Sequence, residues 1–436
     1  MKRYREWNPE QNLLLPPSIK EFVPVGHPAH FVRELVRKEL DLTAIRESYE
    51  EESRGAPPFA PEMMTALLLY AYSQGVYSSR RMARGCEERL DFVAITALNY
   101  PDFRTISLFR KRHHEALGEL FQQVLKLCRK AGMVKLGHVA IDGSKISANA
   151  SKSKGKKYST LKGEEEALEQ EIKKWLDTAQ AVDREEDELY GEDNEDDTPQ
   201  WMKDPEEMLR RVREAKKELE EKDQREREKR ERKEKAGIVA KGRDKPRSEP
   251  KPERRYNFTD PDSEVMKGPQ GFIQGYNTQL AVDAGSHVIV AADVTTKASD
   301  HFELLPMLDQ VRRNCGQKPQ EVSADATYCS EHNLAGLEKR KVRSYIAVCS
   351  TRNGPKRTIV AGSRRAKMWL RLKQGGKRSR YWIRGQTVEP VFGNIKHARG
   401  FRQFLLRGLQ LVKSEFALIA TVHNLLKLSA YRLQRT

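Results

Sequence analysis

Val139-Ala-Ile-Asp-Gly-Ser-Lys145 is the stretch that decides the fold, because the chain changes here from a helical to a strand-like pattern. Its apolar run predicts a strand that continues through Ile146. Ile273–Val282 and His287–Thr295 alternate in the same way, with Asp283-Ala-Gly-Ser as the turn between them. Two further strands and two helices are expected, in chain order, at Phe302–Arg313 (helix), Glu321–Ala324 (strand), Glu331–Lys339 (helix) and Ser344–Val348 (strand).

This order of elements predicts an α/β domain. Three consecutive strands, the first separated from the others by an insertion, are followed by alternating helices and strands. Such an order makes a mixed sheet with helices on both faces. It is the order of a ribonuclease-H-like (RNase H-like) domain, divided here between residues 134–158 and 257–436.

Residues 159–256 form the insertion. Glu, Lys and Arg dominate two helical segments, 160–182 and 203–236, which the acidic stretch Asp183–Asp197 separates. A short apolar seam is confined to the second segment, at Met208, Leu209, Val212, Ala215 and Leu219. We therefore expect a charged helical hairpin whose base packs and whose remainder is solvated, followed by a basic linker over 237–256.

The N-terminal part is expected to be all-α. Residues 1–58 resemble an extended arm with a short helix, and residues 59–133 are helical throughout. Helices are expected at Ser78–Glu88, Asp91–Leu98, Thr105–His113 and Ala116–Ala131. Thr105 suits the N-cap of a helix that exposes Arg110, Lys111 and Arg112. Short helices with a basic last helix are typical of a DNA-binding domain, although a helical bundle with a solvated basic face has the same pattern.

The net charge of +17 is unevenly distributed. Residues 161–240 contain 28 acidic and 18 basic residues, which leaves 62 basic against 35 acidic residues in the remainder. A folded part that is this basic indicates a polyanionic partner, with DNA or RNA as the first expectation. A ribosome-associated or simply soluble basic protein would have the same composition.

Cysteine usage and hydropathy indicate a cytoplasmic protein, associated with the nucleoid when it binds DNA. The five cysteines form no Cys-x-x-Cys pair and their number is odd, so neither a zinc site nor a disulfide framework is indicated. The N-terminus leads into no apolar signal segment, and no apolar run approaches ~18 residues. We expect no membrane partner and no small-molecule cofactor.

Three acidic residues are candidates for the chemistry. Asp142 and Asp325 follow apolar strand segments, and Glu389 precedes Pro390 at the expected start of a helix. Two aspartates and a glutamate brought together would bind Mg²⁺ or Mn²⁺ for phosphoryl transfer. A single aspartate after a strand is more often a turn or cap residue, and Asp283 and Asp293 are competitors for the role.

Several blocks of sequence carry a family resemblance. They are Tyr4-Arg-Glu-Trp-Asn-Pro-Glu-Gln11, Ile141-Asp-Gly-Ser144, Thr259-Asp-Pro-Asp-Ser263, Gly275-Tyr-Asn-Thr-Gln-Leu-Ala-Val-Asp283, Ala324-Asp-Ala-Thr-Tyr328 and Val388-Glu-Pro-Val-Phe-Gly-Asn-Ile-Lys396. In this order and spacing the chain resembles a DDE transposase of bacterial insertion sequences. It is most similar to the group with an all-helical N-terminal domain and a charged helical insert in the RNase H-like catalytic domain.

The resemblance implies a catalytic and metal-binding triad of Asp142, Asp325 and Glu389, with two Mg²⁺ or Mn²⁺ ions as cofactors. It also implies a signature around the glutamate, formed by Tyr381, Arg384 and Lys396, in which the interval from Arg384 is one residue longer than in the family pattern. The implied partners are double-stranded DNA, both element terminal repeats and target DNA, and further copies in a dimer or larger assembly. The residues expected to contact DNA are Arg110, Lys111, Arg112, Lys145, Tyr381, Arg384, Lys396 and Arg399.

The implied activity is metal-dependent DNA cleavage at the ends of the element, followed by strand transfer into target DNA. The basic stretch 364–380 is expected to be a loop beside the scissile strand, with Trp369, Tyr381 and Trp382 available to stack on unpaired bases. Two alternatives stay open: a transposase-derived DNA-binding protein without catalysis, and an RNase H-like nuclease that cuts without joining.

Overall fold

The computed structural model describes residues 18–50, 57–150, 155–182, 205–235, 250, 252, 254–268, 271–348 and 359–435. Four features of the sequence analysis therefore lie wholly or largely outside the described residues. They are the opening block at Tyr4–Gln11, the acidic stretch Asp183–Asp197, most of the linker 237–256, and Cys349. The other four cysteines are buried.

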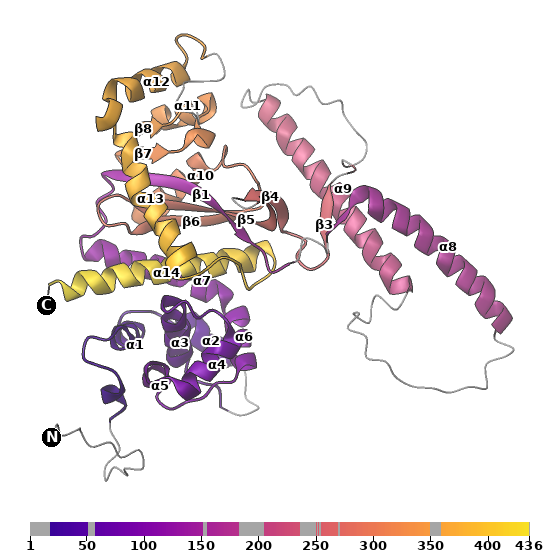
Figure 1. The fold of residues 1–436 in the computed structure, drawn as a ribbon, viewed down its shortest axis with the longest axis horizontal. Helices are drawn as coiled ribbons and strands as arrows, with labels where there is room; N and C mark the ends of the chain where they lie inside the picture. Colours follow the sequence, from indigo (N-terminus) through magenta and orange to yellow (C-terminus); the bar gives the residue numbers. More distant parts are fainter. Residues whose placement is uncertain are drawn as a thin grey trace, which may run out of the picture.

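The N-terminal part is helical, as predicted. Its elements are η1 (Ile19–Phe22), α1 (Pro28–Lys38), α2 (Thr43–Glu50), α3 (Pro61–Ser73), α4 (Ser79–Glu88), α5 (Leu90–Thr96), α6 (Phe103–Arg112) and α7 (His114–Lys130). Helix α3 is buried from Met64 to Tyr72, and the other helices surround it (Figure 1). The expected cap at Thr105 was wrong: the side chain of Asp102 accepts from the backbone N–H groups of Arg104 and Thr105, so α6 begins earlier.

The centre of the molecule is a mixed six-stranded sheet (Figure 1). A mixed sheet was predicted from five strands, and Glu264–Gly268 is a strand that the sequence analysis did not expect. Its strands are β1 (His138–Ser147), β4 (Glu264–Gly268), β5 (Gly271–Asp283), β6 (Ile289–Thr295), β7 (Glu321–Ala324) and β8 (Arg343–Ile346). The path runs β4-β5-β1-β7-β8. β6 pairs with the later part of β5, on the same edge of β5 as β4. β5 is antiparallel to β1, β4 and β6, whereas β7 runs parallel to both β1 and β8.

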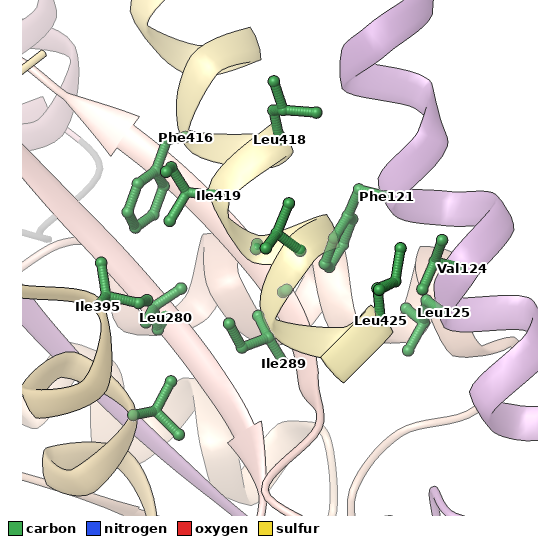
Figure 2. Packing of buried hydrophobic residues seen from close by; sticks show 14 of the residues in the cluster. Phe121, Val124, Leu125, Leu280, Ile289, Ile395, Phe416, Leu418, Ile419 and Leu425 are labelled. Carbon is green, nitrogen blue, oxygen red and sulfur yellow. The ribbon is translucent and has the colours of Figure 1, made fainter. Parts of the chain in front are cut away.

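Helices flank the sheet and join it to the N-terminal part. They are α10 (Leu304–Cys315), α11 (Glu331–Lys339), α12 (Arg364–Gly375), α13 (Ile383–Gly393) and α14 (Leu409–Leu433). Figure 2 shows α14 with Phe121 and Leu125 of α7 on one side and Leu280 and Ile395 on the other. One apolar cluster therefore extends from the first helices through α14 into the sheet.

The insertion is a helical hairpin with a small core of its own. It consists of β2 (Gly155–Lys157), α8 (Tyr158–Val182), α9 (Pro205–Lys235) and β3 (Arg255–Asn257), and β2 pairs with β3 at its base. Figure 1 shows the two helices standing away from the sheet. Their core includes Leu161 and Leu168 of α8 and Leu209 and Leu219 of α9, so the predicted packed base is confirmed.

Two local predictions near the C-terminal part were wrong. The stretch 364–380 is not a loop, because α12 begins there, capped by Ser363, and the 3-10 turns η5 (Gly376–Arg378) and η6 (Arg380–Trp382) follow. Glu389 does not begin a helix, because α13 starts at Ile383 and continues through Pro390 into a π-helical turn, η7 (Asn394–Ala398). A proline removes one helix hydrogen bond, and a π turn adjusts the ladder beyond it.

Candidate active site

Asp142 and Asp325 are neighbours across two parallel strands. β1 pairs with β7 from His138 opposite Glu321 to Ala140 opposite Ser323. Two residues further in this register, Asp142 stands opposite Asp325, where β7 has ended and β1 continues. Adjacent strands lie about 4.8 Å apart and paired residues face the same side. Asp142 is therefore in the middle of its strand, not at its end, and the sheet still brings the two carboxylates together.

Glu389 joins this pair through an arginine. Arg384 Nη1 lies 2.6 Å from Asp142 Oδ2, and Arg384 Nη2 lies 2.7 Å from Glu389 Oε1. The Arg384–Asp142 pair forms because α13 packs across β1, β5 and β7, whereas Arg384 and Glu389 lie on the same helix. Two of the three candidate acids thus share one guanidinium.

The electrostatics of Asp142 reflect this crowding. Burial raises the pKa of the Asp142 carboxyl to about 6, the Arg384 guanidinium opposes the rise, and the charge of Asp325 adds to it. Asp142 Oδ1 also accepts from the backbone N–H of Gly143 at 2.9 Å. A Cβ at Gly143 would crowd the ends of the Gln279 and Asp300 side chains, which would have to shift to admit it.

Asp325 is held by the turn that follows it. It caps the 3-10 turn η4 (Ala326–Tyr328), and its Oδ1 accepts from the backbone N–H of Thr327 at 2.9 Å and from the Thr327 hydroxyl. Its Oδ2 is not used by that cap. The cap therefore fixes the Asp325 side chain at the end of β7 through one carboxylate oxygen and does not engage the other.

Two lysines of the predicted DNA-contacting set belong to β1, the strand that carries Asp142, or contact it. Lys145 Nζ donates to the Asp300 carboxylate at 3.0 and 3.3 Å. Lys396 Nζ donates to Ser144 Oγ at 2.5 Å and to the carbonyl of Lys145 at 2.7 Å. Burial, and then the charge of Lys145, lower the pKa of Lys396. Lys145 follows Asp142 by three residues in β1, and Lys396 contacts that part of the strand.

Asp300 is a polar residue that the sequence analysis missed. Besides Lys145, its carboxylate accepts from Asn277 Nδ2 and Gln279 Nε2, each at 2.7 Å. Tyr328 extends this network by donating to Gln279 Oε1. The signal available was one more aspartate in the turn after a strand, which is too common to single it out.

Tyr381 and Trp382 flank the site on η6. Their rings are 5.6 Å apart at a tilted angle, and the Trp382 ring is 57% exposed. Trp382 Nε1 donates to the carbonyl of Gly376 at 3.2 Å, which fixes the indole on the surface. Trp369 on α12, by contrast, packs partly buried against the core with Lys373 over its ring.

Two arginines of the predicted DNA-contacting set are buried, which corrects that expectation. Arg110 is 6% exposed and donates to Tyr72 Oη at 3.2 Å and to the carbonyl of Tyr77 at 3.1 Å. Arg399 is 7% exposed, and its side-chain nitrogens have no hydrogen-bond partner among the described residues. Burial lowers the pKa of Arg399 to about 10. Neither guanidinium is available to a DNA backbone in this conformation.

The other two α6 residues of the predicted DNA-contacting set are exposed, and one of them has a structural role. Lys111 faces solvent. Arg112 donates through Nη2 to the carbonyl of Ser48 at 2.6 Å and lies over the ring of Tyr49. Of the three consecutive basic residues, Lys111 is thus the one whose side chain projects away from the fold.

The competing acids occupy other surroundings. Asp283 is buried, and it accepts from the backbone N–H groups of Leu136 at 2.8 Å, Gly285 at 3.0 Å and Ser286 at 3.2 Å. Asp293 pairs with Lys413 at 2.8 Å near the surface. The first is a turn-organising residue and the second is a surface ion pair.

Replacing Asp283 by alanine is expected to lower the free energy of unfolding by about 2–3 kcal/mol, because the buried N–H of Leu136 and two partly buried N–H groups lose a charged acceptor. The change in the urea midpoint, followed by circular dichroism, measures it. Asp293→Ala is the matched control and is expected to shift stability by less than about 1 kcal/mol. Equal shifts for the two variants would contradict a structural role for Asp283.

The donor set suits a hard divalent cation. Asp142, Asp325 and Glu389 offer oxygen ligands alone, the kind that Mg²⁺ and Mn²⁺ prefer. Across the described part of the chain, however, no three His, Cys, Asp or Glu side chains are grouped closely enough to hold an ion. The Arg384 guanidinium stands between two of the three carboxylates instead. The three carboxylates fit the ion by their chemistry, but a bound metal ion would have to take the place of the Arg384 guanidinium.

Comparisons with known proteins match two transposase families to this chain. A family model described as "Transposase domain (DUF772)" matches residues 17–112, and one described as "Transposase DDE domain" matches residues 251–425. No curated protein and no solved structure matches the chain. In the described residues, no helix has the length and hydropathy needed to cross a membrane. The two family matches cover more than half of the sequence, and this chain belongs to the DDE transposases of the insertion-sequence type.

Proposed function

We propose that this transposase cuts DNA at the ends of an insertion sequence and joins the cut ends to target DNA, using Asp142, Asp325 and Glu389. The observation that carries the proposal is that Arg384 bridges Asp142 and Glu389, while the register of β1 and β7 places Asp325 beside Asp142. The strand register supports the first two, and the Arg384 bridge supports the third. None of the three segments is near another in sequence, so a chance cluster of turn residues would not explain the arrangement.

The sheet supports an RNase H-like catalytic domain over residues 134–158 and 257–436. In the order β6-β5-β1-β7-β8, the first three strands are antiparallel and the last two run parallel to β1. The α8–α9 hairpin interrupts this domain between β1 and β5. Because the insert enters and leaves through β2 and β3, it lengthens one connection without changing the strand order.

In the proposed mechanism, one or two Mg²⁺ or Mn²⁺ ions would activate the attacking oxygen and stabilise the leaving oxygen of the phosphodiester. The chain's own residues hold the DNA beside the carboxylates. Lys396 binds Ser144, two residues from Asp142 in β1, and Lys145 lies further along the same strand, paired with Asp300. Tyr381 and the exposed Trp382 provide aromatic faces for an unpaired base. Cutting two ends of one element favours a dimer or larger assembly.

The experiment uses labelled duplexes taken from the DNA that flanks the coding sequence, with Mg²⁺ and a plasmid target. We expect cleavage at the element end and a product joined to the plasmid. Efficient cleavage without a joined product would favour a nuclease, and end binding without cleavage would favour a DNA-binding protein. Either result would overturn the proposed function.

The N-terminal helices are proposed to recognise the element ends through a surface on α6. Arg104, Leu108 and Lys111 are exposed and spaced by four and three residues, so they share one face of the helix. Arg80 of α4 lies beside them, over the same Phe103 ring that Arg104 covers. A basic face with a projecting apolar side chain matches the base edges and phosphates of a major groove. We call these four residues the α6 surface.

Arg104→Ala is expected to weaken binding to the element end by about tenfold or more, as for loss of one base contact. Fluorescence anisotropy with a labelled end at fixed salt measures it. Lys126→Ala removes one exposed positive charge from α7 and is the matched control, expected to leave affinity nearly unchanged. Equal affinities for the Arg104 variant and the wild type would rule out the α6 surface.

A further inference from the structure

Arg384 occupies the position that a bound cation would take between two acidic side chains. Its two terminal nitrogens reach different residues, at 2.6 Å to Asp142 and 2.7 Å to Glu389. The Arg384 and Asp142 side chains are only 16% and 17% exposed, so this ion pair is largely shielded from water. Such a bridge holds two carboxylates at a fixed separation.

The neighbouring cations are engaged elsewhere. Lys145 is bound to Asp300, and Lys396 is bound to Ser144 and to the Lys145 carbonyl. The charge of Asp325 also acts on both Arg384 and Asp142. One guanidinium therefore balances a group of three carboxylates that would otherwise repel one another.

We infer that Arg384 is an internal counter-cation, which keeps the three carboxylates together in the metal-free protein and is displaced when a divalent ion binds. The inference rests on the proposed function for the identity of the metal ligands. We take the metal ion to bind the same lone pairs of Asp142 Oδ2 and Glu389 Oε1 that now accept from the guanidinium. Metal binding must therefore break both ion pairs, which lowers its apparent affinity.

The displaced side chain would stay at the site. Arg384 and Glu389 are on the same helix, five residues apart, so a rotation of the arginine side chain moves the guanidinium without moving α13. Its charge then becomes available to a phosphate group beside the carboxylates. The same residue would thus assemble the empty site and contact DNA in the loaded one.

The test is a calorimetric titration of the DNA-free, full-length protein with Mn²⁺. We expect Arg384→Gln to bind Mn²⁺ about tenfold more tightly than the wild type, the equivalent of losing one shielded ion pair, to Asp142, and one half-exposed ion pair, to Glu389. The double variant Asp142→Asn with Arg384→Gln is expected to lose this binding. Arg380→Gln is the matched control, because Arg380 is four residues away and pairs with Glu321 instead.

Each outcome decides the inference. Unchanged or weaker Mn²⁺ binding by Arg384→Gln overturns it, and so does equal tightening by the Arg380 control, which would indicate only a change in overall charge. If binding is unchanged but still depends on Asp142, the proposed function stands without the counter-cation. If no protein shows Asp142-dependent binding and the wild type does not cut DNA, the proposed function fails as well.

Folding of the variant is checked separately. Thermal unfolding in EDTA is expected to show a lower midpoint for Arg384→Gln, and Mn²⁺ is expected to raise that midpoint more than it raises the wild-type value. Arg384→Lys carries the test if the glutamine variant does not fold. A lysine reaches one carboxylate at a time, so its Mn²⁺ affinity should lie between those of the wild type and the glutamine variant; a value equal to the wild type's would overturn the inference.

Discussion

Replacing Asp325 by asparagine is expected to abolish cleavage of element ends while leaving DNA binding within a few-fold of the wild type. The change keeps the size of the side chain and its capacity to cap η4, but it removes the charge beside Asp142. Residues that merely support metal ligands typically contribute about 10–100-fold, so loss of a ligand should exceed about 100-fold. Gel-based cleavage and fluorescence anisotropy on the same labelled end measure the two effects.

The matched control for this variant is Asp293→Asn. It removes the same charge from an aspartate of the same sheet, on β6, where the partner is Lys413. Cleavage by the control should remain close to that of the wild type. A parallel loss of binding and cleavage in Asp325→Asn would instead identify Asp325 as a structural residue.

The second large effect is expected from Glu415→Ala, which should lower the free energy of unfolding by about 3–5 kcal/mol. Glu415 lies on α14, 2% exposed, and accepts from the backbone N–H groups of Leu405 and Leu406, each at 3.0 Å. The Glu415 carboxylate is also the negative counter-charge for the buried Arg110 guanidinium, and burial raises the pKa of Glu415. Removing the carboxylate leaves a buried guanidinium without its counter-charge, which is why the effect is large.

Urea denaturation followed by circular dichroism measures this change, with Ser414→Ala as the neighbouring control on the same helix. Ser414 donates only to the carbonyl of Gln410, within its own helix, so its loss should shift stability by no more than about 0.5 kcal/mol. Glu415→Gln, which keeps the shape, should be intermediate. A Glu415→Ala variant as stable as the control would show that Arg110 does not need its partner.

The sheet could be predicted from the sequence because its strands carry a local signal. Glu321–Ala324 and Glu331–Lys339 have the predicted bounds, and the alternation in β5 and β6 marked those strands to within a few residues. α12 was mistaken for a loop because a helix rich in exposed Arg and Lys has a weak apolar stripe. α13 was begun too late because Pro390 is usually an early helix residue, and here the helix continues through it.

The geometry of the site was harder to predict from the sequence than the sheet. Sequence spacing gave Asp142, Asp325 and Glu389 as candidates only with the help of the family pattern, because the register between β1 and β7 is set by tertiary packing. The bridge formed by Arg384 depends on a rotamer chosen in the folded state. Arg110 and Arg399 were expected on the surface because they are charged, whereas partners such as Tyr72 come from distant segments.

The α8–α9 hairpin has a consequence for how the chain folds. β1 and β5 are adjacent antiparallel strands, yet residues 148–270 separate them, and closing so long a loop is entropically unfavourable. The hairpin has its own apolar core, and β2 pairs with β3 at its base. If the hairpin forms first, the effective loop shrinks to residues 148–154 on one side and 258–270 on the other. The folded insert would then shorten the chain that has to close between β1 and β5, and this would speed the pairing of these two strands.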